Sequence, residues 1–316
     1  MGLEKTKSKG IVALGLALLF LVLTAAAPLY APMYTVILLT SILMYMTMSV
    51  SWALFSGPTG YISLASAAFF GAGIYTAAIL GTTLPFPLVI LFGALVSACL
   101  ALLVGGLTLR LKGIYFVMFT FGLVELLLHF ILWWEITMSG TTGRVVPPAG
   151  NATVFYAMLI ILVILILTVL MIRRSRYGLA LLSIGENEEA AAHAGVHVTA
   201  LKVSIYAVSA LFMGAAGAAM ATRWTYIDPR IAFNPLISFV PVLMAIFGGI
   251  RPIYGPIIGA AIFTYLEEFL ITRFPYYYML IFGIIMVVAI LYMPDGLVGL
   301  TQRIWKKMGR SNHADT

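Results

Sequence analysis

Charge is scarce in this chain: Asp, Glu, Lys and Arg make up 9% of its 316 residues, against about 25% in an ordinary soluble domain. Hydrophobic residues make up 62%, and the mean hydropathy is +1.08. A soluble domain of this size could not remove so much apolar surface from water. The composition therefore predicts an all-α, polytopic integral membrane protein.

Cysteine and the short motifs of enzymes are also scarce. The one cysteine, Cys99, lies within an apolar run, so no intrachain disulfide can form. The chain contains no H-E-x-x-H, C-x-x-C or G-x-S-x-G sequence, and no G-x-x-x-x-G-K-[ST] phosphate-binding loop. We therefore expect no catalytic residues, no metal site and no cofactor. We also expect that the chain does not hydrolyse a nucleotide through such a loop.

Long apolar runs, by contrast, fill the chain and predict about ten transmembrane helices. They lie at residues 11–27, 34–55, 61–80, 86–107, 113–134, 153–172, 202–221, 236–250, 253–271 and 277–293. Two runs are short or interrupted by glycine: 61–80 contains Gly71 and Gly73, and 236–250 ends in Gly248. Interrupted spans in both halves of a chain are typical of a central transport pathway. The first run could instead be a signal peptide, but an uncleaved span is the simpler interpretation.

The distribution of basic residues indicates orientation. Lysine and arginine gather in cytoplasmic connections, so the formal net charge of +7 does not require a nucleic-acid partner. With ten spans and both termini cytoplasmic, fourteen of the 18 basic residues lie inside. The four outside are Arg144, Arg223, Arg230 and Arg273. This arrangement places the most polar internal stretch, residues 173–201, in the cytoplasm.

That cytoplasmic segment predicts a short charged helix between two membrane spans. Three arginines begin it, an acidic run from Glu186 to Glu189 follows, and Gly195 is expected to end the helix. Glu189, His193 and His197 are spaced four apart, which could form a metal site on one helical face. Because Gly195 interrupts that face, a solvated surface is the favoured interpretation.

Two further features are candidates for function. Glu125 lies in the middle of the run at 113–134, with His129 one helical turn later. A carboxylate is costly in lipid, so we expect it to face the protein interior or a polar pathway, or to pair with His129. The long outer connections, 135–152 and 222–235, either anchor the chain at the membrane interface or dock an extracytoplasmic partner.

Four stretches, spread over most of the chain, carry a family pattern. They are Gly60 to Tyr75 (GYISLASAAFFGAGIY), Gly113 to Glu125, Arg176 to Gly195, and Gly248 to Gly299. The first is similar to G-Q-I-S-L-G-H-A-A-F-F-G-x-G-x-Y, and the third to E-A-A-x-x-x-G. In this order and spacing they resemble the permease subunits of ABC importers for branched-chain amino acids, a family that also includes sugar importers.

The resemblance implies that residues 1–316 form a single permease domain in a bacterial or archaeal inner membrane. A homologous permease would form the other half of the translocation pathway. Two cytoplasmic ATPase subunits would use ATP, and an extracytoplasmic binding protein would deliver the solute. The residues implied to couple to the ATPases are Glu186, Glu188, Glu189, Ala190, Ala191 and Gly195. Those implied to line the pathway are Tyr61, Ser63, Ser66, Phe70 and Glu125.

The sequence also departs from the family pattern. Tyr61, Ala65 and Ser66 stand where the family has Gln, Gly and His, and the coupling loop lacks a later Leu-Pro. The solute is therefore left open between branched-chain amino acids and related small polar or organic-acid solutes. An ion-driven secondary transporter is the alternative. It would require ionisable residues in several spans, whereas Glu125 with His129 is the one clear pair.

Overall fold

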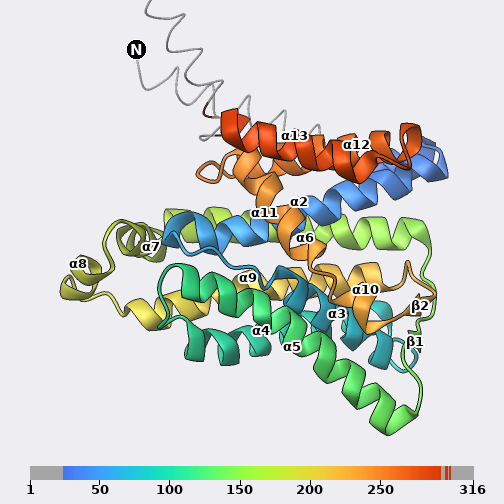
Figure 1. The fold of residues 1–316 in the computed structure, drawn as a ribbon, viewed down its shortest axis with the longest axis horizontal. Coiled ribbons are helices and arrows are strands. Elements are labelled where there is room, and N and C mark those ends of the chain that lie inside the picture. The colour runs from blue at the N-terminus through green and yellow to red at the C-terminus, as the bar shows by residue number, and fades with distance from the viewer. Residues whose placement is uncertain (1–23, 293–295, 298, 300–316) are drawn as a thin grey trace, which may run out of the picture.

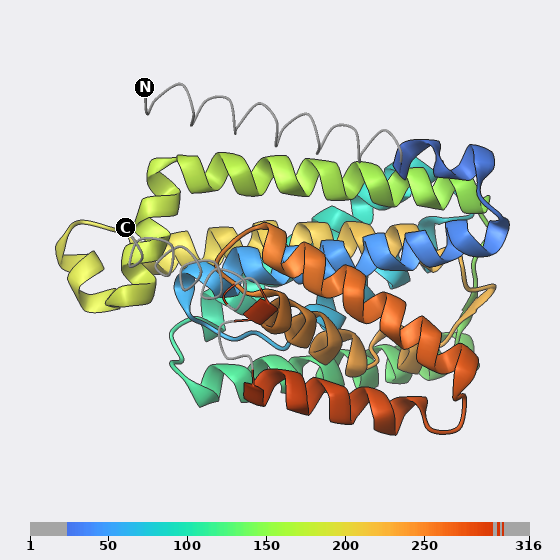
Figure 2. The ribbon, with the colours of Figure 1, turned by 90° about the horizontal axis from the view of Figure 1, so that it is seen from above.

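The computed structural model describes residues 24–292 together with 296, 297 and 299. Long helices run side by side along one axis, and the turns between them gather at the two ends of the bundle (Figures 1 and 2). The predicted first span, 11–27, and both termini lie mostly or wholly outside the described residues. The prediction that both termini are cytoplasmic thus stays a prediction.

The first half of the described chain contains four long helices, one shorter helix and one two-residue strand. They are α2 (Met33–Thr59), α3 (Ser66–Leu80), α4 (Phe86–Thr108), α5 (Ile114–Ser139), β1 (Arg144–Val145) and α6 (Asn151–Arg174). Two short helices then turn across one end of the bundle: α7 (Arg176–Glu186) and α8 (Glu188–His193).

The second half returns through the bundle. Its elements are α9 (Val198–Ala221), β2 (Tyr226–Ile227), α10 (Pro229–Ala232), α11 (Leu236–Gly248), α12 (Tyr254–Arg273) and α13 (Tyr278–Tyr292). Within the described residues, seven helical stretches are long and apolar enough to cross a membrane, and α3 is a shorter apolar helix. The expectation of an all-α polytopic membrane protein is confirmed, while the total of ten spans stays a prediction.

The interruption expected within the run at 61–80 lies elsewhere. Gly71 and Gly73 do not break α3, which is continuous from Ser66 to Leu80. The break is instead the non-helical segment 60–65, which follows α2 after Gly60 adopts a φ of +73°. A span beginning at residue 61 was therefore wrong. A positive φ costs a glycine little, and this explains why the chain turns out of the helix there.

Glycines inside the long helices serve close packing. A Cβ on Gly73 would lie 2.0 Å from the carbonyl oxygen of Gly214, and one on Gly214 would lie 2.1 Å from Ser97 Oγ. Ser97 Oγ donates a 2.8 Å hydrogen bond to the Phe69 carbonyl, so α3, α4 and α9 meet at one point. This triple contact forms the centre of the core, as small residues allow between membrane helices.

Gly214→Ala is expected to destabilise the protein by about 1–3 kcal/mol, because the new methyl group overlaps Ser97 and the core must shift. The unfolding temperature in mild detergent would measure the change. Gly106→Ala on α4 is the matched control, since a Cβ there meets nothing within 4 Å. An equal unfolding temperature for Gly214→Ala and the wild type would contradict this account of the core.

Candidate functional site

The segment 173–201, predicted to be cytoplasmic and to form one helix, contains two helices, separated at Asn187. The Asn187 side chain accepts hydrogen bonds of 3.0 Å from the backbone N–H groups of Glu189 and Ala190, so it caps α8. Ser175 likewise caps α7 by accepting from the Tyr177 N–H at 3.2 Å. The prediction of a continuous helix through the acidic run was therefore wrong: Glu186 ends α7 and Glu188 begins α8.

Gly195 ends α8, as predicted. Its φ is +87°, its N–H donates to the Ala192 carbonyl, and the Val196 N–H donates to the Ala191 carbonyl at 3.1 Å. This pair of bonds is the Schellman arrangement, which fits glycine because a left-handed residue is required. Since Gly195 lies between His193 and His197, these histidines do not share one helix. The described residues contain no group of three His, Cys, Asp or Glu side chains placed to hold a metal ion.

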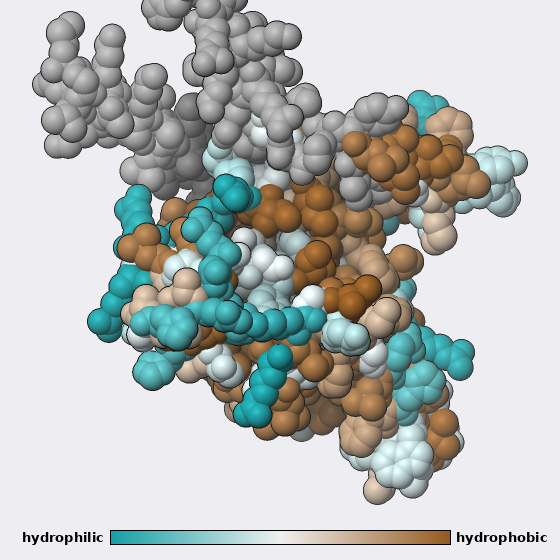
Figure 3. All heavy atoms as spheres, turned by 60° about the vertical axis from the view of Figure 1, so that its left-hand side comes forward, coloured by the Kyte–Doolittle hydropathy of each residue, from teal (hydrophilic) through white to brown (hydrophobic). Residues whose placement is uncertain are grey.

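An apolar contact fixes the orientation of α8. Ile184 of α7, Ala191 of α8 and Val198 of α9 form a small buried cluster of their own. Ala191 therefore faces inward, while Ala190 and Glu189 face solvent. Figure 3 shows hydrophilic side chains gathered over this end of the molecule, with apolar surface around them. The result is a helix pair, with a polar α8 and an α7 that exposes Leu179 and Leu182, which is held in one orientation and extends beyond the ends of the long helices (Figure 1).

A buried lysine joins α8 to the rest of the chain. Lys202, on α9, has a side chain that is 1% exposed, and its Nζ lies 2.7 Å from Glu188 Oε1. The same Nζ donates to the Leu109 carbonyl at 3.0 Å and to the Tyr61 hydroxyl at 3.1 Å. The Tyr61 hydroxyl in turn donates to Glu188 Oε2 at 2.8 Å. We call Tyr61, Glu188, Lys202 and the Leu109 carbonyl the Lys202 cluster.

Every hydrogen-bond donor of the Lys202 ammonium group has a partner in the Lys202 cluster. An ammonium group has three donors, and here each has an acceptor. The Lys202 Nζ also lies 4.4 Å from the centre of the Tyr61 ring, within the range of a cation–π interaction. Partial burial alone would raise the pKa of the Glu188 carboxyl, but hydrogen bonds from Lys202 and Tyr61 outweigh it, and this pKa is lowered. The Glu188 carboxylate is therefore charged at neutral pH, and its contribution to stability is lost as the pH falls through that lowered pKa.

Tyr61 is the second residue of the non-helical segment 60–65, and side chains of three helices hold other groups of this segment. The indole N–H of Trp52 donates to the Ser63 carbonyl at 2.8 Å, and Thr120 Oγ1 accepts from the Leu64 N–H at 3.0 Å. Ser63 Oγ lies 3.0 Å from the Tyr206 hydroxyl. Buried backbone groups outside a helix need such partners. The segment is thus tied to α2, α5 and α9 at once.

The predicted pathway residues of this region lie inside the subunit. Ser63, Ser66 and Phe70 are buried, with 4%, 1% and 0% of their surface exposed. Ser63 and Ser66 line a closely packed space, too narrow for a water molecule, that Trp52 and Tyr206 also line. Ser66 Oγ is buried there with no hydrogen-bond partner among the described residues. Phe70 packs instead against Gly217, where a Cβ would lie 2.0 Å from the Phe70 carbonyl oxygen.

Glu125 does not face the interior of this subunit. It lies on the open side of α5 with a side chain that is 43% exposed, and His129 beside it is 71% exposed. His129 Nδ1 lies 2.9 Å from the Glu125 carbonyl oxygen and 3.9 Å from Glu125 Oε2. The two residues lie on one exposed face of α5 together with Gly122, Leu126, Phe130 and Trp133. Of the alternatives for Glu125, burial within the subunit is excluded.

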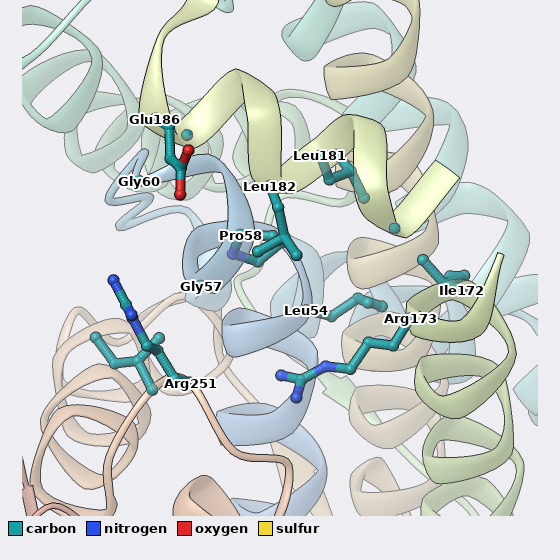
Figure 4. Close-up of a pocket in the computed structure, with 13 residues that line it drawn as sticks. Leu54, Gly57, Pro58, Gly60, Ile172, Arg173, Leu181, Leu182, Glu186 and Arg251 are labelled. Carbon is teal, nitrogen blue, oxygen red and sulfur yellow. The ribbon is translucent and has the colours of Figure 1, made fainter. Parts of the chain in front are cut away.

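A larger cavity lies beside α7, with a volume of about 660 Å³. Figure 4 shows Glu186 at one side of it, and the side chains of Arg173 and Arg251 at other parts of the wall. Leu181 and Leu182 of α7 line it together with the end of α2 around Pro58. The cavity therefore separates part of α7 from the connection between α11 and α12, which carries Arg251.

At the opposite end of the bundle, the two long connections 135–152 and 222–235, which were predicted to lie outside the cell, pair with each other. β1 and β2 are antiparallel, with Arg144 opposite Ile227 and Val145 opposite Tyr226. The buried side chain of Glu135 is bonded to the strand β1 and to the residue before it. Its carboxylate is 1% exposed and accepts hydrogen bonds from the Gly143 N–H at 2.7 Å and from Arg144 Nε at 3.3 Å. The two connections thus form one supported surface, which we call the β1–β2 platform.

Two important residues were not singled out from the sequence. Lys202 was noted as a cytoplasmic cation, and Glu135 as part of an outer connection. In both cases a signal was present, because an ionisable residue at the edge of an apolar run is expensive unless it is paired. The partners themselves, Glu188 for Lys202 and Arg144 for Glu135, could be identified only in three dimensions.

These features define a class of protein: a polytopic membrane protein with a fixed helix pair at one end and a supported platform at the other. The family described as "Branched-chain amino acid transport system / permease component" matches residues 34–290, and the chain belongs to that family. It is a permease subunit of an ABC importer and a multi-pass protein of the inner membrane. The comparisons favour this function over an ion-driven secondary transporter.

Individual relatives agree with the family. The chain is 25% identical to the high-affinity branched-chain amino acid transport system permease protein LivM of Salmonella typhimurium, covering 89% of this chain and 74% of the relative. It is 26% identical to LivM of Escherichia coli over the same shares. The fructose import permease protein FrcC of Rhizobium meliloti is 32% identical over 36% of this chain and 32% of its own. No solved structure matches the chain.

Proposed function

We propose that this subunit forms half of a translocation pathway and that α7 and α8 couple it to ATPase subunits. The observation that carries the proposal is the α7–α8 pair itself. It is capped at both helix starts, ended by Gly195, and held in one orientation by the Ile184, Ala191 and Val198 cluster. A helix pair held in one orientation at the end of the bundle is suited to transmit a displacement from a soluble partner. The cavity beside α7 provides space for such a movement.

The exposed face of α5 is the proposed contact with a second, homologous permease. Of the 18 consecutive residues that form the most apolar part of α5, 22% are buried in this subunit. This is the smallest buried share among the seven candidate spans within the described residues. Glu125 and His129 lie on that open face, and a carboxylate in contact with lipid is costly. A second permease, or the polar pathway enclosed between the two subunits, would remove that cost. We propose that the partner is a different chain of the same family, which gives a heterodimer.

The β1–β2 platform is the proposed docking surface for an extracytoplasmic binding protein. It lies at the end of the bundle opposite α7 and α8 (Figure 1), as delivery of solute from outside requires. Its strands carry the exposed side chains of Val145 and Tyr226. The names of the LivM relatives favour branched-chain amino acids as cargo, with a related small polar or organic-acid solute as the wider class.

Co-purification tests the coupling role. The tagged chain, expressed with the other components of its transporter and extracted in mild detergent, is expected to retain two ATPase subunits. Replacing residues 183–197 by a flexible Gly-Ser linker of equal length is expected to release them. Solute uptake by the purified chain alone, without any ATPase, would contradict the proposal and favour a secondary transporter.

A further inference from the structure

The Lys202 cluster connects four parts of the chain that are distant in sequence. Glu188 belongs to α8, Lys202 to α9, Leu109 to the turn between α4 and α5, and Tyr61 to the segment 60–65. It is therefore the point at which the proposed coupling helix is tied to the core by an ion pair. Its strength comes from charge-assisted hydrogen bonds in a buried site, which are stronger than neutral ones.

A displacement of Glu188 has a direct mechanical route to α5. Tyr61 is bonded to Glu188 at 2.8 Å, and three residues further on the Leu64 N–H is bonded to Thr120 of α5 at 3.0 Å. The intervening residues are not helical, so their hydrogen bonds are made to side chains that belong to other elements. Thr120 and Glu125 belong to the same helix, and that helix is packed loosely against the rest of the subunit.

We propose that Lys202 is a positioning residue that transmits movement of α8 to α5 through Tyr61 and the segment 60–65. The inference rests on the proposed function of α7 and α8 as the coupling element. When an ATPase displaces α8, Glu188 pulls on Lys202 and Tyr61 together, because both are bonded to its carboxylate. Tyr61 then shifts the segment 60–65, and Thr120 carries the shift into the helix whose open face holds Glu125.

Stability alone does not account for this buried charge. Replacing a buried ion pair by apolar or neutral groups of similar volume is often neutral or stabilising, whereas removing one partner is strongly destabilising. The double variant Lys202→Met with Glu188→Gln should therefore fold, since it leaves no unpaired charge. The single variant Lys202→Met leaves Glu188 unpaired and is expected to unfold at a lower temperature than the double variant.

The test uses the complete transporter, reconstituted in liposomes with its ATPases and binding protein. The double variant is expected to retain its ATPase subunits and to hydrolyse ATP, while the amount of solute transported per ATP falls about tenfold, within the usual range of a coupling free energy. Tyr61→Phe keeps the ring beside Lys202 and removes the hydroxyl. The amount of solute that this variant transports per ATP should therefore lie between the values for the wild type and the double variant. Lys112→Gln removes an exposed charge near Glu188 that makes no bond in the cluster, and its ratio should equal that of the wild type.

The outcomes separate this inference from the proposed function. A double variant with the wild-type ratio of solute to ATP would overturn the role of Lys202 while leaving α7 and α8 as the coupling element. Loss of the ATPase subunits from the double variant would also overturn it, because the cluster would then only hold the docking surface in shape. A wild-type chain that binds no ATPase would overturn the proposed function, and this inference with it.

Discussion

Glu189→Lys is expected to weaken ATPase binding strongly, and with it solute uptake, while leaving the permease folded in the membrane. The Glu189 side chain is exposed, and its backbone N–H, not its carboxylate, is the group bonded to Asn187. A lysine in the first turn of α8 costs the helix about 0.3–1 kcal/mol through its dipole. At an interface with a partner, reversing a charge costs more, about 2 kcal/mol or roughly 30-fold in affinity.

The measurements are ATPase co-purification and solute uptake, compared with the yield of folded protein. Thr199→Lys is the matched control, because it adds the same charge to an exposed position in the first turn of α9, outside the helix pair. Normal uptake by Glu189→Lys would exclude this face of α8 as the contact.

The end of α8 offers a second comparison: Gly195→Asn should be tolerated and Gly195→Val should not, since asparagine adopts a positive φ more readily than a β-branched residue.

Glu125→Gln is expected to reduce solute uptake about tenfold, or about 1.4 kcal/mol, with no change in the unfolding temperature. The carboxylate lies on the open side of α5, so its removal should not disturb the packing of this subunit. Glutamine keeps the size of the side chain and removes the charge. Uptake in reconstituted liposomes and thermal unfolding in detergent measure the two effects separately.

Glu125→Leu distinguishes a pathway from a lipid contact. If the side chain faced lipid, leucine would remove a costly charge, so the protein would gain stability and uptake would stay unchanged. If the side chain faces the pathway or the second permease, leucine should lower uptake at least as much as glutamine does. An increase in stability with normal uptake would therefore contradict the functional role assigned to Glu125.

Much of the helical framework was predictable because membrane helices leave strong local signals. Apolar runs of about 20 residues identify spans, and glycine after a charged helix identifies its end. Both signals depend on neighbouring residues alone, which is why the α5 span and the end of α8 at Gly195 agree with the structure. The break at Asn187 was missed because an asparagine cap and a helical asparagine look alike in an acidic run.

The candidate site was less predictable, because it depends on which side chains meet. Tyr61 and Glu188 were singled out for different roles, and the structure places them on one buried lysine. Ser63 and Ser66 are buried inside the subunit beside Trp52 and Tyr206, and their role in lining a pathway stays a prediction. Periodicity cannot separate these cases in a membrane protein, since a helix surrounded by protein and a helix facing lipid are both apolar.

The sequence by itself determined the class of protein, the positions of the long helices, and the polar segment that crosses one end of the bundle. These follow from composition and local pattern, because lipid excludes unpaired backbone groups and charge. Only the tertiary structure decided which faces are open, as on α5, and which charges are paired, as for Lys202 and Glu135. Lys202 and its partner Glu188 are 14 residues apart in the sequence, and Glu135 and its partner Arg144 are nine apart. These pairs form because helices and connections fold back on one another, and no local sequence pattern specifies that.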